Sequence, residues 1–242
     1  MDMNGQRVLV TGGTSGVGRA LAEVLVGRGA KVVVCGRSAV ESARAVRADL
    51  GVPGEAARTV AAAVERLGGL DVVVANAGVQ YRTPLTLGPV AETLALAREE
   101  IEVNLASVVE LAAAAWPHLA ATGRAASFVA VTSGLGYAPK QSAPVYCATK
   151  AAVHVMVESL RHQSRTVAPQ VGVQEVVLPL VDTAMTAGRE GPARKIAPER
   201  AALAIVRGVE RGRDTVPVGA SRMLLALLRV APPVAKRILR DG

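Results

Sequence analysis

Short apolar runs, rich in valine, alternate along the chain with longer segments in which apolar positions recur at the period of a helix. This alternation is typical of repeated strand–helix–strand units. A run that is apolar throughout, such as the valines that follow Asp71, favours a parallel sheet covered by helices on both faces. We therefore expect an α/β fold with a doubly wound parallel sheet of about seven strands.

The pattern also places the individual elements. It predicts strands over Arg7–Thr11, Lys31–Cys35, Ala45–Ala48, Leu70–Asn76, Ala126–Thr132, Gly172–Leu178 and Thr215–Val218. Helices are predicted over Leu21–Arg28, Glu55–Leu67, Glu92–Ala115, Val145–Val167 and Pro198–Arg211.

One spacing departs from this scheme. Only Gly36–Arg44 separates the second predicted strand from the third, whereas a crossover with a full helix needs about 10–12 residues or more. Either the helix between these strands is truncated to a vestige, or the strand at Ala45–Ala48 is misplaced.

Length and composition limit the classes of protein. The chain has 242 residues, of which 50% are hydrophobic and 20% charged, enough for one sizeable core and short for two. We expect a single domain over residues 1–242. With one Trp, three Tyr and one Phe, the core must be built from Ala, Val and Leu, and an aromatic platform for single-stranded nucleic acid is disfavoured.

The cysteines and the first residues bear on location. Cys35 and Cys147 cannot form a disulfide framework, and no motif has metal-ligand spacing, so we expect no metal site. The segment Met1–Arg7 leads into a strand without a secretory apolar region, and no apolar run approaches the ~18 residues needed to span a bilayer. These features predict a cytoplasmic protein in a reducing compartment.

The net charge of +8 is concentrated in one part of the chain. Residues 1–188 carry +1 and residues 189–242 carry +7. Such a field suits an anionic substrate or carrier, a membrane surface or nucleic acid, or it is a solvated surface. Within the C-terminal segment 221–242, the stretch Ser221–Arg240 is apolar on one side and basic on the other; we favour packing on its own domain or a neighbouring subunit over an anionic membrane.

A glycine-rich turn follows the first predicted strand and opens a helix. In Thr11–Gly18 (TGGTSGVG), the glycines let the backbone turn sharply and approach a pyrophosphate, and the helix N-terminus offers amide donors. A tight turn without a ligand is the competing interpretation. The candidate phosphate-binding residues are Gly12, Thr14, Ser15, Gly16, Val17 and Gly18.

A tyrosine and a lysine stand four residues apart on a predicted helix. Tyr146 and Lys150 would share one face, with Cβ atoms about 5–6 Å apart. An ammonium beside a phenol favours the phenolate and so lowers a pKa that starts near ~10. Tyr146 could then exchange a proton near neutral pH. An exposed pair without a role is the alternative for these two residues taken alone.

Five ordered motifs give a family resemblance. They are the glycine turn, Asn76–Gly78 (NAG), Asn104, Ser133 thirteen residues before Tyr146, and the Y-x-x-x-K of Tyr146–Lys150. In these motifs the chain resembles the short-chain dehydrogenase/reductase family, over nearly its whole length. The resemblance implies a Rossmann-like fold and hydride transfer between a nicotinamide and a carbonyl or alcohol carbon.

The resemblance also implies the catalytic residues Asn104, Ser133, Tyr146 and Lys150. Ser133 would hydrogen-bond the substrate oxygen, and Tyr146 would protonate it during reduction. Lys150 would also bind the nicotinamide ribose, and Asn104 would hold a water in a proton relay. A polar helix residue that satisfies a neighbouring carbonyl is the alternative for Asn104.

The residues at the end of the second predicted strand indicate which cofactor the chain prefers. Enzymes that prefer NAD commonly place an acidic residue there to bind the ribose 2′-hydroxyl. This chain has Gly36 at that position and Arg37 next to it. A guanidinium can pair with a 2′-phosphate, so we predict NADP(H) rather than NAD(H). A solvated Arg37 without this role is the alternative.

Other cofactor contacts follow from the resemblance. Asp49 matches the acid that accepts from the adenine amino group, and Thr183 matches the threonine that contacts the carboxamide. Leu180 departs from the family's usual glycine. If the helix after the second strand is truncated, we expect a more open adenosine pocket. The remaining implied contacts are Leu50, Asn76, Ala77, Gly78, Pro179 and Val181, with Tyr146 and Lys150 themselves.

The segment 184–197 corresponds to the family's substrate lid. It is short and basic, with Arg189, Arg194 and Lys195, which predicts an open mouth and a bulky, anionic or carrier-presented substrate. The resemblance further implies a homodimer or homotetramer formed through the helices Glu92–Ala115 and Val145–Val167.

The leading hypothesis is an NADP(H)-dependent ketone reductase or secondary-alcohol dehydrogenase. A non-catalytic NADP-binding redox sensor is the alternative, disfavoured by the presence of Ser133, Tyr146 and Lys150. A nucleic-acid-binding role ranks third, because the sequence contains no recognised motif for it.

Overall fold

The computed structural model describes residues 1–189, 191 and 194–240. Seven strands form one parallel sheet in the order β3-β2-β1-β4-β5-β6-β7. The chain reverses its direction of growth between β1 and β4, which confirms the doubly wound, Rossmann-like fold. The strands are β1 (Arg7–Thr11), β2 (Lys31–Gly36), β3 (Ala45–Arg47), β4 (Val72–Ala75), β5 (Ala126–Ser133), β6 (Val171–Leu178) and β7 (Thr215–Pro217).

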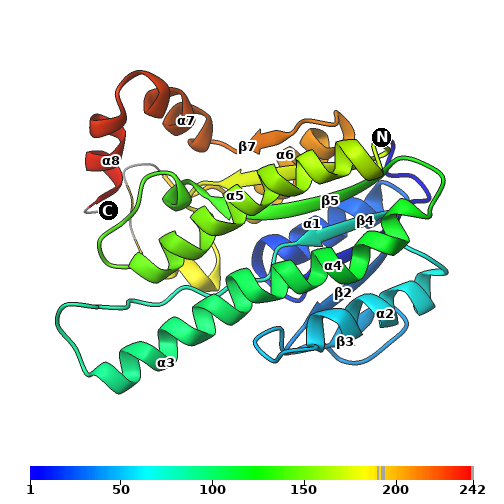
Figure 1. Cartoon of the computed structure of the whole chain (residues 1–242), viewed down its shortest axis with the longest axis horizontal. Coiled ribbons are helices and arrows are strands. Elements are labelled where there is room, and N and C mark those ends of the chain that lie inside the picture. Colours follow the sequence, from blue (N-terminus) through cyan, green and yellow to red (C-terminus); the bar gives the residue numbers. More distant parts are fainter. Residues whose placement is uncertain (190, 192–193, 241–242) are drawn as a thin grey trace.

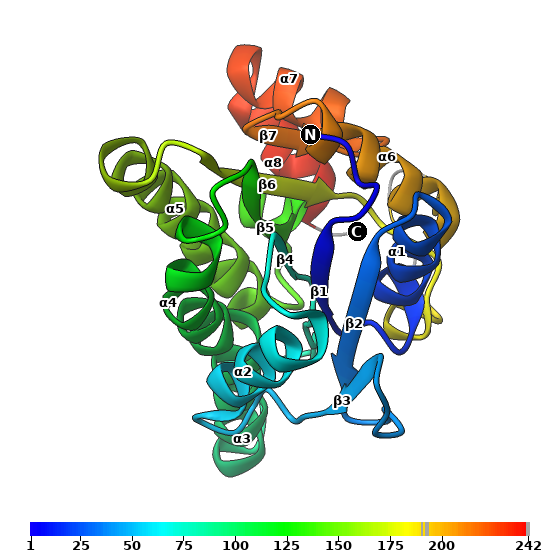
Figure 2. The ribbon, with the colours of Figure 1, turned by 90° about the vertical axis from the view of Figure 1, so that its right-hand side faces the viewer.

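Helices cover both faces of the sheet. Figure 2 shows α1 (Gly16–Gly27) and α6 (Pro198–Glu210) on one face. The other face carries α2 (Glu55–Leu67), α4 (Ser107–Ala120) and α5 (Pro144–Val167). Each face has its own core of Val, Leu and Ala, because the central strands are apolar on both sides. Phe128 of β5 is the one phenylalanine and is fully buried.

The connection between β2 and β3 contains no helix. Residues 37–44 form turns and loop, with a single antiparallel bridge between Ser42 and Ala45. β3 begins at Ala45, where it was predicted, so the truncated helix is the correct interpretation of the short spacing.

The predicted helix Glu92–Ala115 is longer than expected and is not regular throughout. It consists of α3 (Val90–Ile101), a π-helical turn (Glu102–Ala106) and α4. The expectation of one uninterrupted helix was therefore wrong. The wider turn places Asn104 where both atoms of its amide bond the backbone of Val79, each at 2.8 Å, and such turns often mark functional sites.

The C-terminal segment folds into two helices, α7 (Ser221–Val230) and α8 (Pro232–Arg240), which form a hairpin at one end of the molecule (Figure 1). The chain bends at Ala231, before two prolines that a continuous helix would not tolerate. Arg222 Nε donates to the Pro217 carbonyl at 3.1 Å, and Gln141 N–H donates to the Arg240 carbonyl at 3.1 Å. The hairpin thus packs on its own chain; residues 241 and 242 of the predicted segment lie outside the described residues.

No helix of the described chain combines the length and apolar character that a bilayer-spanning segment requires.

Candidate active site

The glycine turn between β1 and α1 permits no larger residue at its key positions. Gly12 and Gly16 have φ angles of +63° and +51°, a region that favours glycine. A Cβ atom on Gly18 would lie 2.2 Å from the Gly12 carbonyl oxygen and 2.6 Å from Asn76 Nδ2. The backbone of the turn therefore packs directly against the segment after β4.

Thr11 holds the glycine turn and the segment after β4 together. Its Oγ1 accepts the N–H groups of Asn76 and Ala77, each at 3.0 Å, and Asn76 Nδ2 donates to the Thr11 carbonyl at 2.9 Å. Thr11 belongs to the glycine motif, but its sequence position alone did not reveal this role. Ser15 makes no side-chain cap in the described structure, so the first amides of α1 remain available to an anion.

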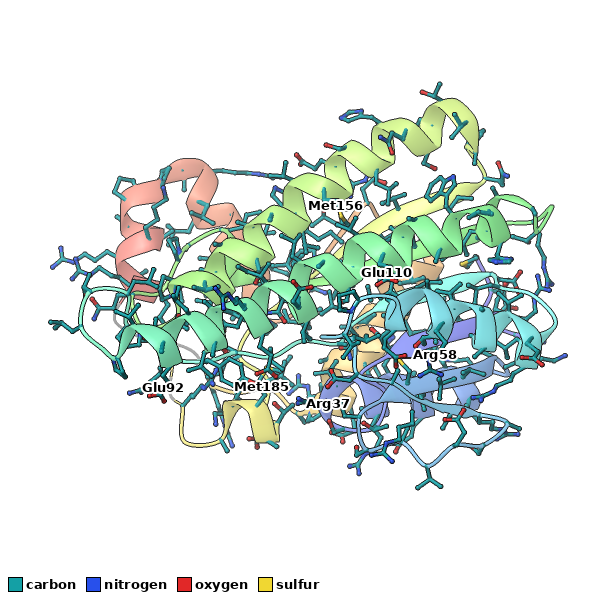
Figure 3. All side chains as sticks on the ribbon, turned by 60° about the horizontal axis from the view of Figure 1, so that its bottom comes forward. Arg37, Arg58, Glu92, Glu110, Met156 and Met185 are labelled. Atoms are coloured by element: carbon teal, nitrogen blue, oxygen red, sulfur yellow. The ribbon has the colours of Figure 1, made fainter. Side chains whose placement is uncertain are left out.

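A cavity of about 730 Å³ opens where the carboxyl ends of β1, β4, β5 and β6 meet. Every site residue chosen from the sequence lines it except Asn104: Gly12, Thr14, Ser15, Gly16, Val17, Gly18, Arg37, Asp49, Leu50, Asn76, Ala77, Gly78, Ser133, Tyr146, Lys150, Pro179, Val181 and Thr183. Figure 3 labels two lining residues from different loops, Arg37 after β2 and Met185 after β6.

Ser133, Tyr146 and Lys150 come together inside this cavity. Ser133 ends β5, Tyr146 lies in the first turn of α5, and Lys150 follows one turn later. The Ser133 hydroxyl lies close enough to the Tyr146 phenol to influence its pKa, and it accepts Leu135 N–H at 3.2 Å. Lys150 Nζ lies 5.8 Å from the centre of the Tyr146 ring and donates to the Val131 carbonyl at 3.0 Å.

The ionisation of this group differs from the sequence prediction. Burial raises the pKa of Tyr146 to about 12, although the nearby Ser133 hydroxyl acts in the opposite direction. Burial also lowers the pKa of Lys150 to about 8. The prediction that Lys150 lowers the pKa of Tyr146 is therefore wrong for this structure, because burial is the largest influence on the phenol and the Lys150 ammonium bonds the Val131 carbonyl instead. At neutral pH the phenol is a protonated donor.

Asn104 lies behind the cavity. Its Oδ1 accepts Val79 N–H and its Nδ2 donates to the Val79 carbonyl, with a further contact to Thr149 Oγ1 at 3.3 Å. In these bonds Asn104 satisfies a neighbouring backbone carbonyl, as the alternative interpretation expected. Its role in a proton relay stays a prediction. A Cβ on Gly78 would lie 3.1 Å from Asn104 Oδ1 and 3.6 Å from Lys150 Nζ, so Gly78 brings the two polar groups close.

Arg37 stands at the rim of the cavity. Its side chain is 60% exposed and its Nη1 lies 3.4 Å from Glu99 Oε1, a long contact that leaves most of the guanidinium available. Ser38 Oγ donates to Thr14 Oγ1 at 3.2 Å. Ser38 also lines the cavity and was missed, because a serine in a loop carries no distinctive sequence signal.

Asp49 and Thr183 line the cavity from two separate segments, after β3 and after β6. One oxygen of Asp49 accepts Gly51 N–H at 3.0 Å, and its side chain is exposed. Thr183 approaches the glycine turn so closely that a Cβ on Gly16 would lie 3.1 Å from Thr183 Cγ2. The segment after β6 therefore closes the cavity over the start of α1.

The predicted lid is tied to the segment before it. Asp182 N–H donates to the Ile196 carbonyl at 2.9 Å, and Lys195 Nζ donates to the Thr186 carbonyl at 2.7 Å. Arg189 bonds the side chain of Gln80 and donates to its carbonyl at 2.9 Å. Residues 190, 192 and 193 of this segment lie outside the described residues.

The hairpin α7–α8 also lines the cavity, a contribution that was not predicted from the sequence. The residues that it contributes are Ala220, Ser221, Met223, Leu224, Leu227, Ile238 and Leu239. Apolar side chains of the hairpin, which is far from the motifs along the sequence, therefore narrow the cavity entrance that was predicted to be open. Within the described ranges, no cluster of His, Cys, Asp or Glu could hold a metal ion.

Comparison with known proteins adds to this geometry. A family model described as short chain dehydrogenase matches residues 6–192. The chain is 38% identical over 194 residues to the uncharacterized oxidoreductase DltE of Bacillus subtilis (strain 168). The aligned residues cover 76% of this chain and 75% of the relative.

Two solved structures resemble the fold. A short chain dehydrogenase from Burkholderia cenocepacia J2315 in complex with NADP has a TM-score of 0.84 and 28% identity, covering 99% of this chain and 100% of that one. A short chain dehydrogenase/reductase from Burkholderia phymatum in complex with NAD also has a TM-score of 0.84, at 21% identity, covering 100% and 99%. The second likeness concerns the fold alone.

Proposed function

Because this chain belongs to the short-chain dehydrogenase/reductase family, we propose that it is an NADP(H)-dependent oxidoreductase that interconverts a ketone and a secondary alcohol. The observation that carries the proposal is the meeting of Ser133, Tyr146 and Lys150 in the cavity that the glycine turn borders. A protein that only sensed a dinucleotide would not need a half-buried phenol beside a serine hydroxyl.

The residues present fit a nicotinamide dinucleotide. The glycines let the turn pack tightly on the segment after β4, since a Cβ on Gly12 would lie 2.9 Å from Ala77 Cα, and the uncapped start of α1 lines the cavity. The turn and the start of α1 would hold the pyrophosphate, Asp49 and Leu50 the adenine, and the segment from Pro179 to Thr183 the nicotinamide end. When bound, the nicotinamide donates or accepts the hydride.

The chain's own residues handle the proton. Ser133 would orient the substrate oxygen beside Tyr146, and the Tyr146 hydroxyl would give that oxygen a proton during reduction. The raised pKa of Tyr146, about 12, keeps the phenol protonated before the reaction. Lys150 supplies a positive charge one helical turn away, which stabilises the phenolate that remains.

Three observations support NADP(H). An acidic side chain at position 36 does not fit, since a Cβ on Gly36 would already lie 2.6 Å from Thr14 Oγ1. Arg37 lies at the cavity rim beside this position, and its Glu99 partner is far enough away for a phosphate to compete. The 28% identical Burkholderia cenocepacia protein is in complex with NADP.

We also propose a homo-oligomer assembled through α3, α4 and α5, whose outer faces expose Leu94, Ile101, Val109 and Val155. A cytoplasmic location is supported by Cys35 and Cys147, which are both buried free thiols and suit a reducing compartment.

The test is a panel of ketones and secondary alcohols, followed through nicotinamide absorbance with NADPH or NADP⁺ and with the NAD pair. Tyr146→Phe should lower kcat by ~100- to 10,000-fold, the usual contribution of a general acid, while NADPH binds with unchanged affinity. Tyr81→Phe is the matched control, because Tyr81 does not line the cavity in the described structure; it should retain wild-type turnover.

Equal turnover in wild type and Tyr146→Phe would exclude Tyr146 as the proton donor. Tight NADPH binding without turnover of any panel member would favour the redox-sensor alternative.

A further inference from the structure

The part of the cavity beyond Ser133 and Tyr146, here named the outer chamber, has apolar walls. Leu135 contributes from the turn after β5, Leu180 and Met185 from the segment after β6, and Leu224 and Leu227 from α7. The wall begins beside the candidate catalytic serine, since a Cβ on Gly134 would lie 2.7 Å from Leu224 Cδ2. A substrate that reaches Ser133 must therefore pass along aliphatic side chains.

Among the described residues, one charged side chain lines this chamber. Of the described cavity residues, the charged ones are Arg37, Asp49, Lys140 and Lys150. Arg37 and Asp49 belong to the end formed by β2 and β3, and Lys150 stands at Tyr146. This leaves Lys140 as the charge of the outer chamber.

Lys140 is anchored through its backbone, and its ammonium has no partner among the described residues. Its N–H donates to Cys147 Sγ at 3.3 Å, and the next residue, Gln141, bonds the end of α8. Within the part of the chain that the structure describes, the ammonium makes no hydrogen bond and no ion pair. A half-buried lysine without a counter-ion is an available anchor for an anion.

The surroundings of Lys140 are electropositive. Burial lowers the pKa of Lys140, and the positive charges of Arg189 and Arg82 lower it further. Arg189 is held by Gln80 rather than by a carboxylate. Among the residues that the structure describes, the buried Glu100 lies in electrostatic range of Arg189, and burial raises the pKa of this carboxyl. An anion bound at Lys140 would offset this local excess of positive charge.

Building on the proposed function, we propose that the substrate is an aliphatic carbonyl compound with a carboxylate end: its chain lies against α7–α8, and Lys140 binds the carboxylate. The apolar wall supplies affinity in proportion to chain length, and the lysine selects the charged end.

The kinetic test compares medium-chain oxo acids with their methyl esters, which have nearly the same shape and no charge. Wild type should prefer the acid. Lys140→Gln should raise the KM for the acid ~10-fold or more, the worth of a hydrogen bond to a charged group, and leave the KM for the ester and both kcat values unchanged. Lys236→Gln is the control, because Lys236 is an exposed lysine of α8 that does not line the cavity in the described residues; it should match wild type.

The chain contact is tested separately. Leu227→Asn should weaken the gain in kcat/KM with chain length and leave a short neutral ketone unaffected. Turnover of short ketones without discrimination between acid and ester would overturn the Lys140 assignment while the oxidoreductase function stands.

Calorimetry with decanoate and decanol needs no turnover and therefore tests the chamber if the proposed function fails. Wild type should bind decanoate more tightly than decanol, and Lys140→Gln should bind the two alike. Equal affinity of wild type for both, or an equal loss of both in Lys140→Gln, would overturn the proposal.

Discussion

At the residue scale, the glycine turn makes the sharpest steric prediction. Gly18→Ala places a Cβ 2.2 Å from the Gly12 carbonyl, so the turn must shift away from the pyrophosphate position. We expect NADPH affinity to fall ~100-fold, as for other displacements of about 1 Å in a binding site, while the circular dichroism spectrum stays native.

Gly27 is the matched control for this change. It ends the same helix, and a Cβ there would meet no atom within 4 Å. Gly27→Ala should bind NADPH normally and raise stability by ~0.5–1 kcal/mol, because alanine loses less backbone entropy on folding. Comparable NADPH affinities in the two variants would contradict the close packing of the turn.

Cofactor preference depends on one exposed side chain. Arg37→Gln removes the guanidinium that we assign to the 2′-phosphate, and the contact with Glu99 is too exposed to matter for stability. We expect kcat/KM for NADPH to fall by about 10- to 100-fold, with little change for NADH. If wild type uses NADH as well as NADPH, the assignment is wrong.

The lowered pKa of Lys150 predicts a pH dependence. Reduction needs the proton on Tyr146, whose pKa is about 12, and the charge on Lys150, whose pKa is about 8. Below pH 8 both conditions hold, so kcat/KM for ketone reduction should be level at neutral pH and fall as the pH rises through about 8. A rate profile with a matching profile for Lys150→Arg tests this, since a guanidinium keeps its charge to above pH ~12 and should remove the fall. A wild-type profile that stays level to pH ~10 would contradict the prediction.

At the scale of elements, the sequence pattern predicted the bounds of those helices and strands that depend only on their own residues. β1 and α2 begin and end at their predicted residues, since apolar period and flanking glycines are properties of the segments themselves. The π-helical turn was missed because the contact that it serves is not local: Asn104 within it bonds the backbone of Val79, twenty-five residues earlier. The wall formed by α7 was missed for the same reason: Leu224 meets Gly134, some ninety residues earlier.

The junction of β1 and β4 supports a stability prediction. Asp71 has a side chain that is 0% exposed, and it accepts Arg7 Nε at 2.9 Å and Arg7 Nη2 at 2.7 Å, with Arg124 Nη2 at 3.0 Å. Asp71→Asn breaks a buried ion pair and should cost about 3 kcal/mol of the free energy of unfolding in urea. Arg124→Gln, which removes the half-exposed partner, should cost less than ~1 kcal/mol.

The ionisation of Asp71 determines the pH range in which Asp71→Asn lowers the stability. Burial on its own would raise the pKa of Asp71, but the hydrogen bonds and charge of Arg7 outweigh it and hold the pKa below its ordinary value. A lowered folded-state pKa contributes stability above the unfolded value and loses it as the pH falls. The difference between wild type and Asp71→Asn should therefore be full at neutral pH and shrink below pH ~4. A difference that does not vary with pH would show that the charge of Asp71 is unimportant.

At the scale of the whole molecule, the parallel sheet explains how residues far apart in sequence form one site. The carboxyl ends of all strands point to the same edge, and the order of strands reverses between β1 and β4. Gly16 and Thr183 come into contact there although 167 positions separate them. The motifs could therefore be placed from the sequence, whereas the apolar outer chamber could not, because it depends on where the C-terminal hairpin settles.

The outer faces of the helices predict how copies associate. α4 and α5 lie side by side on one face of the sheet in both ribbon views, and Val109 and Val155 are 50% and 60% exposed on them. Exposed valines on neighbouring helices favour contact with a second copy of the chain, since burial removes apolar surface from water.

Val109→Glu combined with Val155→Glu should dissociate the assembly, because each unpaired carboxylate buried in an interface costs ~2 kcal/mol or more. Light scattering during size-exclusion chromatography would show the loss of mass at equal protein concentration. Val26→Glu is the control, since Val26 is 46% exposed on α1, which covers the opposite face of the sheet. A wild-type monomer, or a double variant that keeps its assembled mass, would exclude this face as the interface.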